Sequence, residues 1–498
     1  RFILDGELVE IENIDPTRTV LQYLREDIGR VGSKEGCAEG DCGACTVVVG
    51  EVVDDRIQFR AVNACIQFIP TLDGKMLLTV ESLRSAQGQL HPVQQSMVDY
   101  HGSQCGFCTP GFIMSMFALF KTDADPDRKA IDDALSGNLC RCTGYRPIIE
   151  ATRHMTDYAA PADANPILFS PAKENATGAS EQEQAMVKRL QKLQRKQGLQ
   201  LEGSGRKYFA PVSTDELAEL YVQHADACIL AGGTDVGLWV TKQLRELPEV
   251  IYLGNVAQLN QCNETDAGIE IGAAVSLTDA FDKLSEQFPE LAEMFRRFSS
   301  VPVRNAGTLV GNIANGSPIG DSMPALICIG ARVKLRQGGK SREMGLEALY
   351  IGYQKNALQS GEFIKSVIIP KRDESMKLRC YKLCKRFDQD ISAVCAAFAL
   401  RLDGDQVASI DIAFGGMAAI PKRATQTEAM LSGKPWNEDT VQQAMKTLAQ
   451  DFSPLSDMRA SAAYRQQAAA NLLYRFYLET RAQDALAAEA VNVFAVQA

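Results

Sequence analysis

The sequence predicts a multi-domain protein of the α+β class, and three observations lead to that prediction. The chain has 498 residues, which corresponds to about three domains at roughly 150 residues per domain. Its hydrophobic share of 46% and charged share of 23% are those of an ordinary globular protein. Strand-like and helix-like segments follow one another along the chain, and eight of the 14 cysteines fall within the first 142 residues.

Residues 1–82 have the pattern of a small α+β domain. Asp5-Gly6 lies between two alternating segments, which is typical of a hairpin turn. The segment "TVLQYLREDIG" places its apolar residues on one helical face. The segments "CTVVVGEVV" and "RIQFRAVNAC" then predict two strands joined through a turn.

Residues 83–160 predict four helices, in "HPVQQSMVDYHG", "PGFIMSMFALFK", "AIDDALSG" and "PIIEATRHMTDYA". Thr109 is the predicted N-cap of the second helix, with a proline after it. Cys105 and Cys108 are therefore expected in the loop that leads into this helix. Cys140 and Cys142 are expected just after the helix that ends near Gly137.

The rest of the chain divides into a linker and two further parts. Residues 161–204 are rich in Pro, Ala, Asn, Glu, Gln and Lys, so we expect an exposed linker with one short basic helix. Strands alternate with helices over 205–378. Residues 379–498 contain the predicted strands "AVCAAFALRL" and "VASIDIAFGGM", followed by Ala-rich helices.

Charge and targeting signals limit the class of protein. The net charge of −10 and the pI near 5.2 argue against nucleic acid as the main partner. The longest apolar runs fall short of the roughly 20 residues that a membrane span needs. The chain opens without Met and without a signal segment, so we expect a true start slightly upstream and a cytoplasmic location. Its cysteines should then be reduced thiols, metal ligands or catalysts.

The first cysteine group has the spacing Cys-x4-Cys-x2-Cys-x19-Cys, formed by Cys37, Cys42, Cys45 and Cys65. Plant-type [2Fe–2S] ferredoxins use C-x4-C-x2-C followed by a distant fourth cysteine. Gly40 and Gly43 let the loop come close to an inorganic core, and their N–H groups can donate to its sulfurs. The alternatives are a structural zinc site or unliganded thiols, but zinc sites prefer paired C-x2–4-C knuckles.

The second group consists of Cys105 and Cys108, in a C-x2-C pair, and Cys140 and Cys142, in a C-x-C pair. Such a set can bind zinc, form a redox dithiol or hold a two-iron cluster. Cys-x-Cys puts two thiolates on one tight turn, which suits a bridged two-iron core at least as well as a single ion. The spacing alone favours the cluster.

Two later segments have features of a nucleotide site. "ILAGGTDVG" at 229–237 is a strand that runs into a glycine turn, whose N–H groups can cradle a pyrophosphate. The motif by itself is short, and on the motif alone a plain strand–helix turn is the favoured interpretation. The stretch 300–326 gathers Thr308, Gly311, Asn312 and Asp321 in a polar loop, which indicates close approach to a ligand.

The cysteine segments together are similar to a known module. "EGCAEGDCGACTV", "QCGFCTPG" and "GNLCRCTGYRPI" resemble the two-[2Fe–2S] module of the xanthine dehydrogenase family of molybdenum hydroxylases. The resemblance implies a β-grasp ferredoxin domain at 1–82 and a four-helix [2Fe–2S] domain at 83–160. It also implies that the helical cluster lies beside a molybdopterin. Gln104 matches the position that touches the pterin, and Arg141 lies between two ligands.

The later segments resemble the FAD-binding domain shared by xanthine dehydrogenases and the carbon monoxide dehydrogenase flavoprotein. This implies a two-part α+β FAD-binding domain at 205–378 and an α/β C-terminal domain at 379–498. The pyrophosphate loop falls on Ile229, Leu230, Ala231, Gly232, Gly233, Thr234, Asp235 and Val236. Other flavin contacts fall on Phe298, Thr308, Asp321, Ile364 and Lys382, and Tyr353 falls near the nicotinamide position.

The resemblance implies the iron–sulfur and flavin subunit of a bacterial member of the family, because nothing in the chain resembles the molybdopterin-binding part. We expect a molybdopterin-binding large subunit as partner, in a heterotetramer or larger, and no catalytic residue for purine hydroxylation on this chain. Electrons from hypoxanthine and xanthine would reach NAD⁺ through two [2Fe–2S] clusters and FAD. A hydroxylase of aldehydes or other N-heterocycles, oxygen as acceptor, and a non-catalytic zinc scaffold are the alternatives.

Overall fold

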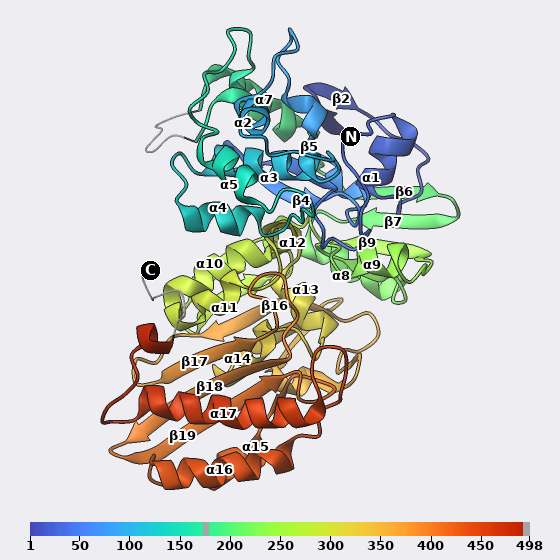
Figure 1. The fold of residues 1–498 in the computed structure, drawn as a ribbon. Coiled ribbons are helices and arrows are strands. Elements are labelled where there is room, and N and C mark those ends of the chain that lie inside the picture. Colours follow the sequence, from blue (N-terminus) through green and yellow to red (C-terminus); the bar gives the residue numbers. More distant parts are fainter. Residues whose placement is uncertain (173–178, 492–498) are drawn as a thin grey trace. The chain divides into compact units, whose positions relative to one another are not determined.

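The computed structural model describes residues 1–172 and 179–491, and these divide into two compact units (Figure 1). The first unit comprises 1–258 together with the short segments 276–278 and 299–307. The second unit comprises 259–275, 279–298 and the chain from 308 onward. The multi-domain α+β class predicted from the sequence is confirmed. No helix within the described ranges is long and apolar enough to cross a membrane.

The first unit begins with a five-stranded mixed sheet in the order β2-β1-β5-β3-β4. Strands β1 and β5 pair in parallel, and the other neighbours pair in antiparallel fashion. The helical segment α1 continues into a π-helical turn, and its Leu21 and Leu24 pack on this sheet. The predicted hairpin, helix and strand pair are confirmed. The bounds are β1 Phe2–Leu4, β2 Glu7–Val9, α1 Val20–Gln22, β3 Thr46–Val53, β4 Arg56–Asn63 and β5 Met76–Leu78.

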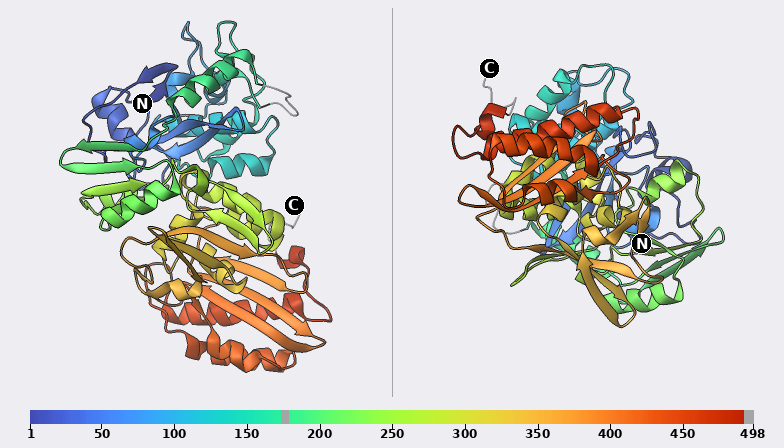
Figure 2. Two further views of the ribbon diagram at one scale, coloured as in Figure 1. Left: turned by 180° about the vertical axis from the view of Figure 1, so that it is seen from behind. Right: turned by 90° about the horizontal axis from the view of Figure 1, so that it is seen from below.

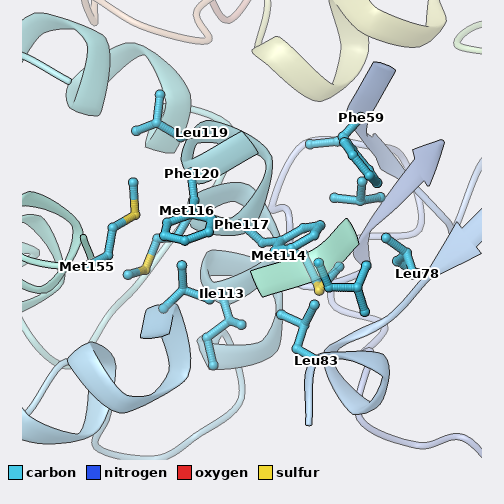
Figure 3. Close-up of a cluster of buried hydrophobic side chains, with 14 of the residues drawn as sticks. Phe59, Leu78, Leu83, Ile113, Met114, Met116, Phe117, Leu119, Phe120 and Met155 are labelled. Carbon is cyan, nitrogen blue, oxygen red and sulfur yellow. The ribbon is translucent and has the colours of Figure 1, made fainter. Parts of the chain in front are cut away.

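Four helices follow, as predicted: α2 Pro92–Asp99, α3 Thr109–Thr122, α4 Arg128–Leu135 and α5 Arg146–Arg153. Helix α3 is apolar on nearly all sides because it is buried between the first sheet and the other helices. Figure 3 shows Phe117 and Phe120 of α3 in a cluster that includes Phe59 of β4 and Met155 after α5. The helix begins one residue earlier than expected, with Cys108 as N-cap and Thr109 inside its first turn.

The prediction of an exposed linker at 161–204 is wrong for much of the segment, and its residues 173–178 lie outside the described residues. Helices α6 Pro166–Phe169 and α7 Glu181–Leu193 bury one face each in the core of the helical domain. The buried side chains are Ile167, Leu168, Phe169, Met186, Val187 and Leu190. Few apolar residues are enough here, because they fall on one helical face.

A second sheet of the first unit has the order β6-β7-β9-β8. Strands β7, β9 and β8 run parallel, and helices α8 and α9 connect them. The bounds are β6 Leu199–Gly203, β7 Arg206–Ala210, α8 Thr214–Gln223, β8 Cys228–Leu230, α9 Val236–Thr241 and β9 Glu249–Tyr252. Helix α12, Val301–Ala306, also belongs to the first unit.

The second unit contains an antiparallel sheet in the order β10-β11-β16-β12-β13. The strands are β10 Cys262–Thr265, β11 Gly268–Gly272, β12 Arg332–Gln337, β13 Lys340–Gly345 and β16 Phe363–Pro370, and β14 Tyr350–Gly352 pairs with β15 Lys355–Asn356. The helices are α10 Leu277–Gln287, α11 Ala292–Arg296, α13 Leu309–Asn315 and α14 Ser322–Cys328.

The C-terminal sheet has the order β17-β18-β19-β20, and its helices lie together on one face (Figures 1 and 2). All its strand pairs are antiparallel, so the predicted α/β label is corrected to α+β for this part. The strands are β17 Lys377–Leu383, β18 Val394–Asp403, β19 Gln406–Gly415 and β20 Lys422–Arg423. The helices are α15 Thr425–Leu431, α16 Glu438–Asp451 and α17 Ala462–Thr480.

Candidate functional site: two groups of four thiols and a glycine turn

The first four predicted cysteines come together at the loop before β3 and the turn after β4. The backbone N–H of Cys42 donates to the Cys37 sulfur at 3.3 Å. The Cys37 thiol also lies within hydrogen-bonding reach of the thiols of Cys42 and Cys65, and the Cys65 thiol lies within such reach of the Cys45 thiol. The Cys42 thiol, followed by that of Cys65, holds the pKa of Cys37 well below its ordinary value. The contact with Cys37 in turn raises the pKa of the Cys42 and Cys65 thiols, so this arrangement favours a thiolate at Cys37.

Two features hold the cysteine loop in this conformation: positive φ angles at its glycines and a hydrogen bond from the end of β4. Gly43 has φ +69°, and a Cβ there would lie 2.1 Å from the Gly137 carbonyl oxygen. Only glycine fits such a position. Asn63 at the end of β4 donates to the Gly40 carbonyl at 2.8 Å, so strand and loop are tied together beside Cys65.

The second four predicted cysteines also come together, from the loops that precede α3 and α5. The thiol of Cys105 faces that of Cys142, and the thiol of Cys108 faces that of Cys140. The Phe107 backbone N–H, followed by the Cys142 thiol, lowers the pKa of Cys105. Burial raises the pKa of Cys108 to about 12. Cys105 and Cys142 are exposed, so this group opens to the surface of the first unit.

The donor chemistry of both groups fits a two-iron cluster. Each group offers four free thiols, and four cysteine thiolates are the ligand set of a [2Fe–2S] centre. In such a centre the four thiolates are shared between two irons rather than placed around one. The eight cysteines could therefore hold two such clusters.

The two thiol groups touch each other through the backbone. The N–H of Leu139, next to Cys140, donates to the Cys42 carbonyl at 3.0 Å. The ring of Phe107, between Cys105 and Cys108, approaches to 3.5 Å from where a Gly36 Cβ would stand. A single hydrogen bond therefore connects Cys42, a member of the first group, to the loop that carries Cys140 of the second group.

The predicted pyrophosphate loop, Ile229–Val236, lies in the first unit as a strand-to-helix turn. Strand β8 ends at Leu230, Gly233 has φ +75°, and α9 begins at Val236. A Cβ at Gly232 would lie 1.9 Å from the Ala306 carbonyl oxygen, so this glycine allows the close packing of α12. Burial raises the pKa of the Asp235 carboxyl.

The glycine turn packs against the first thiol group. A Cβ at Gly237 would lie 2.6 Å from the carbonyl oxygen of Ile66, the residue after Cys65. The Thr241 hydroxyl at the end of α9 donates to the carbonyl of Ala38, the residue after Cys37, at 2.7 Å. Helix α9 therefore bridges the turn and two neighbours of the predicted ligands.

Seven other predicted flavin contacts lie in the second unit: four of them belong to the polar stretch 300–326, and a fifth, Lys382 on β17, pairs with Asp321 of that stretch. The Thr308 hydroxyl caps α13 by accepting from the Gly311 N–H at 2.9 Å. Asn312 accepts from the Ser322 hydroxyl at 2.6 Å, beside Asp321. The buried ammonium of Lys382 donates to Asp321, whose other carboxylate oxygen is buried without a partner among the described residues. Such an unpaired acceptor fits a ligand that donates a hydrogen bond.

The remaining predicted positions stand apart from that stretch. Phe298 packs edge-on against Phe281, with ring centroids 5.3 Å apart. Ile364 is buried in β16. Tyr353 is 60% exposed at the β14–β15 turn. In the first unit, Gln104 and Arg141 are exposed on the two cysteine loops.

Comparison with known families matches nearly the whole chain in four parts. Residues 2–69 match the 2Fe–2S iron–sulfur cluster binding domain, and residues 79–153 match the [2Fe–2S] binding domain. Residues 200–372 match the FAD binding domain in molybdopterin dehydrogenase, and residues 379–480 match the CO dehydrogenase flavoprotein C-terminal domain. The chain corresponds to the iron–sulfur and flavin portion of the molybdenum hydroxylase family.

Individual relatives agree with this assignment. The chain is 33% identical to the xanthine dehydrogenase of Emericella nidulans over 97% of its own length and 39% of that protein. It is 31% identical to the xanthine dehydrogenase/oxidase of Rattus norvegicus, over 96% of the chain and 38% of that protein. The chain thus spans about two fifths of the length of these curated relatives.

Solved structures of the family are similar too. A carbon monoxide dehydrogenase from Hydrogenophaga pseudoflava, which lacks the Mo-pyranopterin moiety, aligns with a TM-score of 0.51 at 26% identity. The alignment covers 54% of this chain and 94% of that one. Reconstituted CO dehydrogenase from Oligotropha carboxidovorans aligns with a TM-score of 0.51 at 25% identity, covering 55% and 96% of the two chains.

Several residues contact the cysteines or join their loops, and the sequence alone did not predict these contacts. The Tyr145 hydroxyl accepts from the Cys140 N–H at 3.0 Å, and Thr143 lies 3.3 Å from the Cys140 sulfur. Buried Asn138 joins the two cysteine loops. In the sequence, their closeness to Cys140 was the one available signal.

Among the six remaining cysteines, the sulfurs of Cys380 and Cys395 lie 3.9 Å apart on neighbouring strands.

Proposed function

We propose that this chain is the electron-transfer subunit of a bacterial xanthine dehydrogenase. It would carry electrons from the molybdopterin centre of a large partner subunit, by way of two [2Fe–2S] clusters and FAD, to NAD⁺. Hypoxanthine and xanthine would be oxidised to urate on the partner. When bound, the clusters supply single-electron steps and the flavin supplies hydride transfer, while the chain sets their spacing and access.

The residues of this chain would share the work as follows. Each group of four thiols would hold one cluster, and backbone N–H groups such as that of Cys42 would stabilise its negative charge. The Ile229–Val236 turn would bind the FAD pyrophosphate. Asp321, which pairs with Lys382 in a buried site, would accept a hydrogen bond from the flavin moiety.

The single observation that carries the proposal is the unbroken line of contacts within the first unit. The exposed group around Cys105 touches the group around Cys42 through the Leu139 hydrogen bond. The latter group touches the glycine turn through Ile66 and Ala38. This order supports entry of electrons at the exposed group and exit at the flavin.

The test uses the complete holoenzyme with Cys105→Ser. The proposal predicts loss of purine-to-NAD⁺ electron transfer, because Cys105 belongs to the entry group, with NADH-to-dye transfer largely retained. Cys380→Ser, outside both groups, is the control and should retain both activities. Equal loss of both activities in Cys105→Ser would contradict the proposed order.

A related hydroxylase of aldehydes or another N-heterocycle is the second candidate, because similar solved structures include carbon monoxide dehydrogenases, so a likeness to this portion of the family does not by itself specify a purine substrate. Turnover of a panel of purines, aldehydes and N-heterocycles by the native complex separates the two. Reduction of NAD⁺ by xanthine favours the first candidate, and turnover confined to another substrate class favours the second.

A further inference from the structure

A buried asparagine holds the contact between the two thiol groups. Asn138 follows α4 and precedes Leu139 and Cys140, and it is 2% exposed. Its side-chain amide donates to the Gly43 carbonyl at 3.1 Å and to the Thr46 hydroxyl at 3.3 Å. Its side-chain carbonyl accepts from the Ser115 hydroxyl at 2.6 Å. One side chain thereby links the loop of the first group, β3, and helix α3 of the second.

This amide lies directly beside the backbone bond that joins the two groups. Leu139 donates to Cys42, and Asn138 donates to Gly43, so two consecutive residues on one loop bind two consecutive residues on the other. Cys42 is itself a predicted ligand of one cluster, and Leu139 is bonded to Cys140, a predicted ligand of the other. A small slide of either loop would lengthen both hydrogen bonds together.

The surroundings leave the two loops very little freedom. Gly111 of α3 is packed so closely that a Cβ there would lie 2.1 Å from the Gly43 carbonyl oxygen. The Gly43 carbonyl also accepts from the Thr46 N–H at 3.0 Å and hydroxyl at 2.7 Å. Fixed glycine contacts set how closely the loops approach, and the Asn138 amide sets their register.

We propose that Asn138 is a positioning residue for electron transfer, which holds the Cys42 carbonyl against the Leu139 N–H and so sets the electronic coupling between the two thiol groups. The inference rests on the proposed function, since it needs a cluster in each group. Electron tunnelling weakens exponentially with the length of its route, and a hydrogen-bonded step conducts better than an open gap. Loss of the Asn138 amide is therefore expected to slow transfer between the groups while each group remains intact.

The experiment compares three variants of the full chain, purified anaerobically with iron and flavin. Asn138→Asp keeps the size and the acceptor for Ser115 but removes the amide donors. Asn138→Ser is a second, uncharged variant, whose side chain is too short to reach the same partners. It tests the loss of the amide donors even if the carboxylate introduced by Asn138→Asp disturbs folding. Ser115→Ala is the matched control, because it removes a buried hydrogen bond of Asn138 but leaves the amide donors in place.

Two readouts besides turnover are measured. The first is hydrogen exchange of the peptide that contains the Leu139 N–H. The second is the rate at which the second cluster becomes reduced after mixing with NADH, followed by freeze-quench electron paramagnetic resonance. Iron content and the signal of each cluster establish that both groups are loaded.

The Asn138 variants should retain both cluster signals, exchange the Leu139 amide faster, and reduce the second cluster severalfold more slowly, because the hydrogen-bonded route between the two groups is broken or lengthened. Ser115→Ala should match the wild type in the reduction rate. An unchanged rate in both Asn138 variants, with both clusters present, would overturn the inference. A wild-type chain without clusters would instead overturn the proposed function.

Discussion

At the scale of single residues, two glycines of the cysteine loops illustrate different needs. Gly43 and Gly106 both have positive φ, at +69° and +84°. A Cβ at Gly43 would collide with the Gly137 carbonyl at 2.1 Å and the Asn138 amide nitrogen at 2.5 Å, whereas nothing lies within 4 Å of a Cβ at Gly106. Gly43 is required by both backbone angle and space, and Gly106 by backbone angle alone.

Substitution by alanine should separate these two needs. Gly106→Ala carries only the cost of a left-handed residue, about 1–2 kcal/mol. Gly43→Ala adds the steric overlap, so its unfolding midpoint and its retained iron should both fall further than those of Gly106→Ala. Thermal unfolding and iron analysis of the two variants check this, and equal effects would contradict the close contact between the loops.

His91 gives a residue-level prediction for pH. Its side chain caps α2 by accepting from the Val93 N–H, and it is fully buried among Phe117, Phe120 and Phe169. Burial lowers the pKa of His91 to about 4, from an ordinary value of 6.5. The unfolded chain then binds more protons than the folded chain between these values. Stability from this group is complete above pH 6.5 and falls by roughly 3 kcal/mol as the pH drops toward 4.

His91→Asn keeps a capping acceptor but cannot titrate in this window. We expect the unfolding midpoint of the wild type to fall more steeply between pH 6.5 and 4.5 than that of the variant. Thermal unfolding of both proteins in matched buffers measures the difference between their unfolding midpoints at each pH. The carboxylates contribute equally to both proteins, so their effect cancels in this difference. Parallel pH profiles would show that His91 does not stay neutral in the folded protein.

At the scale of elements, helix α7 joins the core through very few side chains. Met186, Val187 and Leu190 are buried, whereas Lys188 and most other residues of α7 are exposed. The composition of the segment therefore suggested a linker, although its apolar residues share one face.

Leu190→Ala should destabilise the first unit by about 2–5 kcal/mol, because it leaves a cavity in a closely packed core. Lys188→Ala on the same helix should change stability by less than about 0.5 kcal/mol, as is usual for exposed positions. Chemical unfolding of the two variants measures the contrast. Similar values would contradict the packing of α7 in the core.

Strand β17 carries a second element-level prediction. Lys382 of β17 pairs with Asp321, which precedes α14, and both side chains are almost completely buried, at 3% and 5% exposure. Lys382→Met would leave the carboxylate buried and unpaired, at a cost of about 3–5 kcal/mol. The amount of FAD that the Lys382→Met variant retains after gel filtration should also fall.

Lys385→Met is the control for Lys382→Met, because Lys385 is exposed a few residues further along the chain. Stability and flavin content of this variant should stay close to those of the wild type. If Lys382→Met behaves in the same way, the buried ion pair does not organise the second unit.

The same elements show how far a sequence can predict this fold and its candidate site. The four helices, the hairpin and the two cysteine loops were predicted, because periodicity and spacing are local properties. The hydrogen bond between Leu139 and Cys42, and the clamp formed by Asn138, join residues that are about a hundred positions apart, so no local pattern indicates them. The antiparallel direction of the C-terminal strands, by contrast, is set locally, because β18 and β19 are joined by the two-residue turn Gly404-Asp405.

At the scale of the whole molecule, the chain has the parts of the electron-transfer portion of a molybdenum hydroxylase. Two iron–sulfur domains, an FAD-binding domain and a flavoprotein C-terminal domain account for its family matches. The chain spans about two fifths of the length of the curated relatives it matches.

The central claim, that eight thiols hold two separate two-iron clusters in a chain that also binds flavin, is tested most directly by metal, sulfide and flavin analysis with electron paramagnetic resonance. The anaerobically purified chain should contain about four irons and about four acid-labile sulfides. It should also contain one FAD and show two distinct signals on reduction. A colourless chain that carries zinc, or an iron protein with a single cluster signal, would contradict the claim.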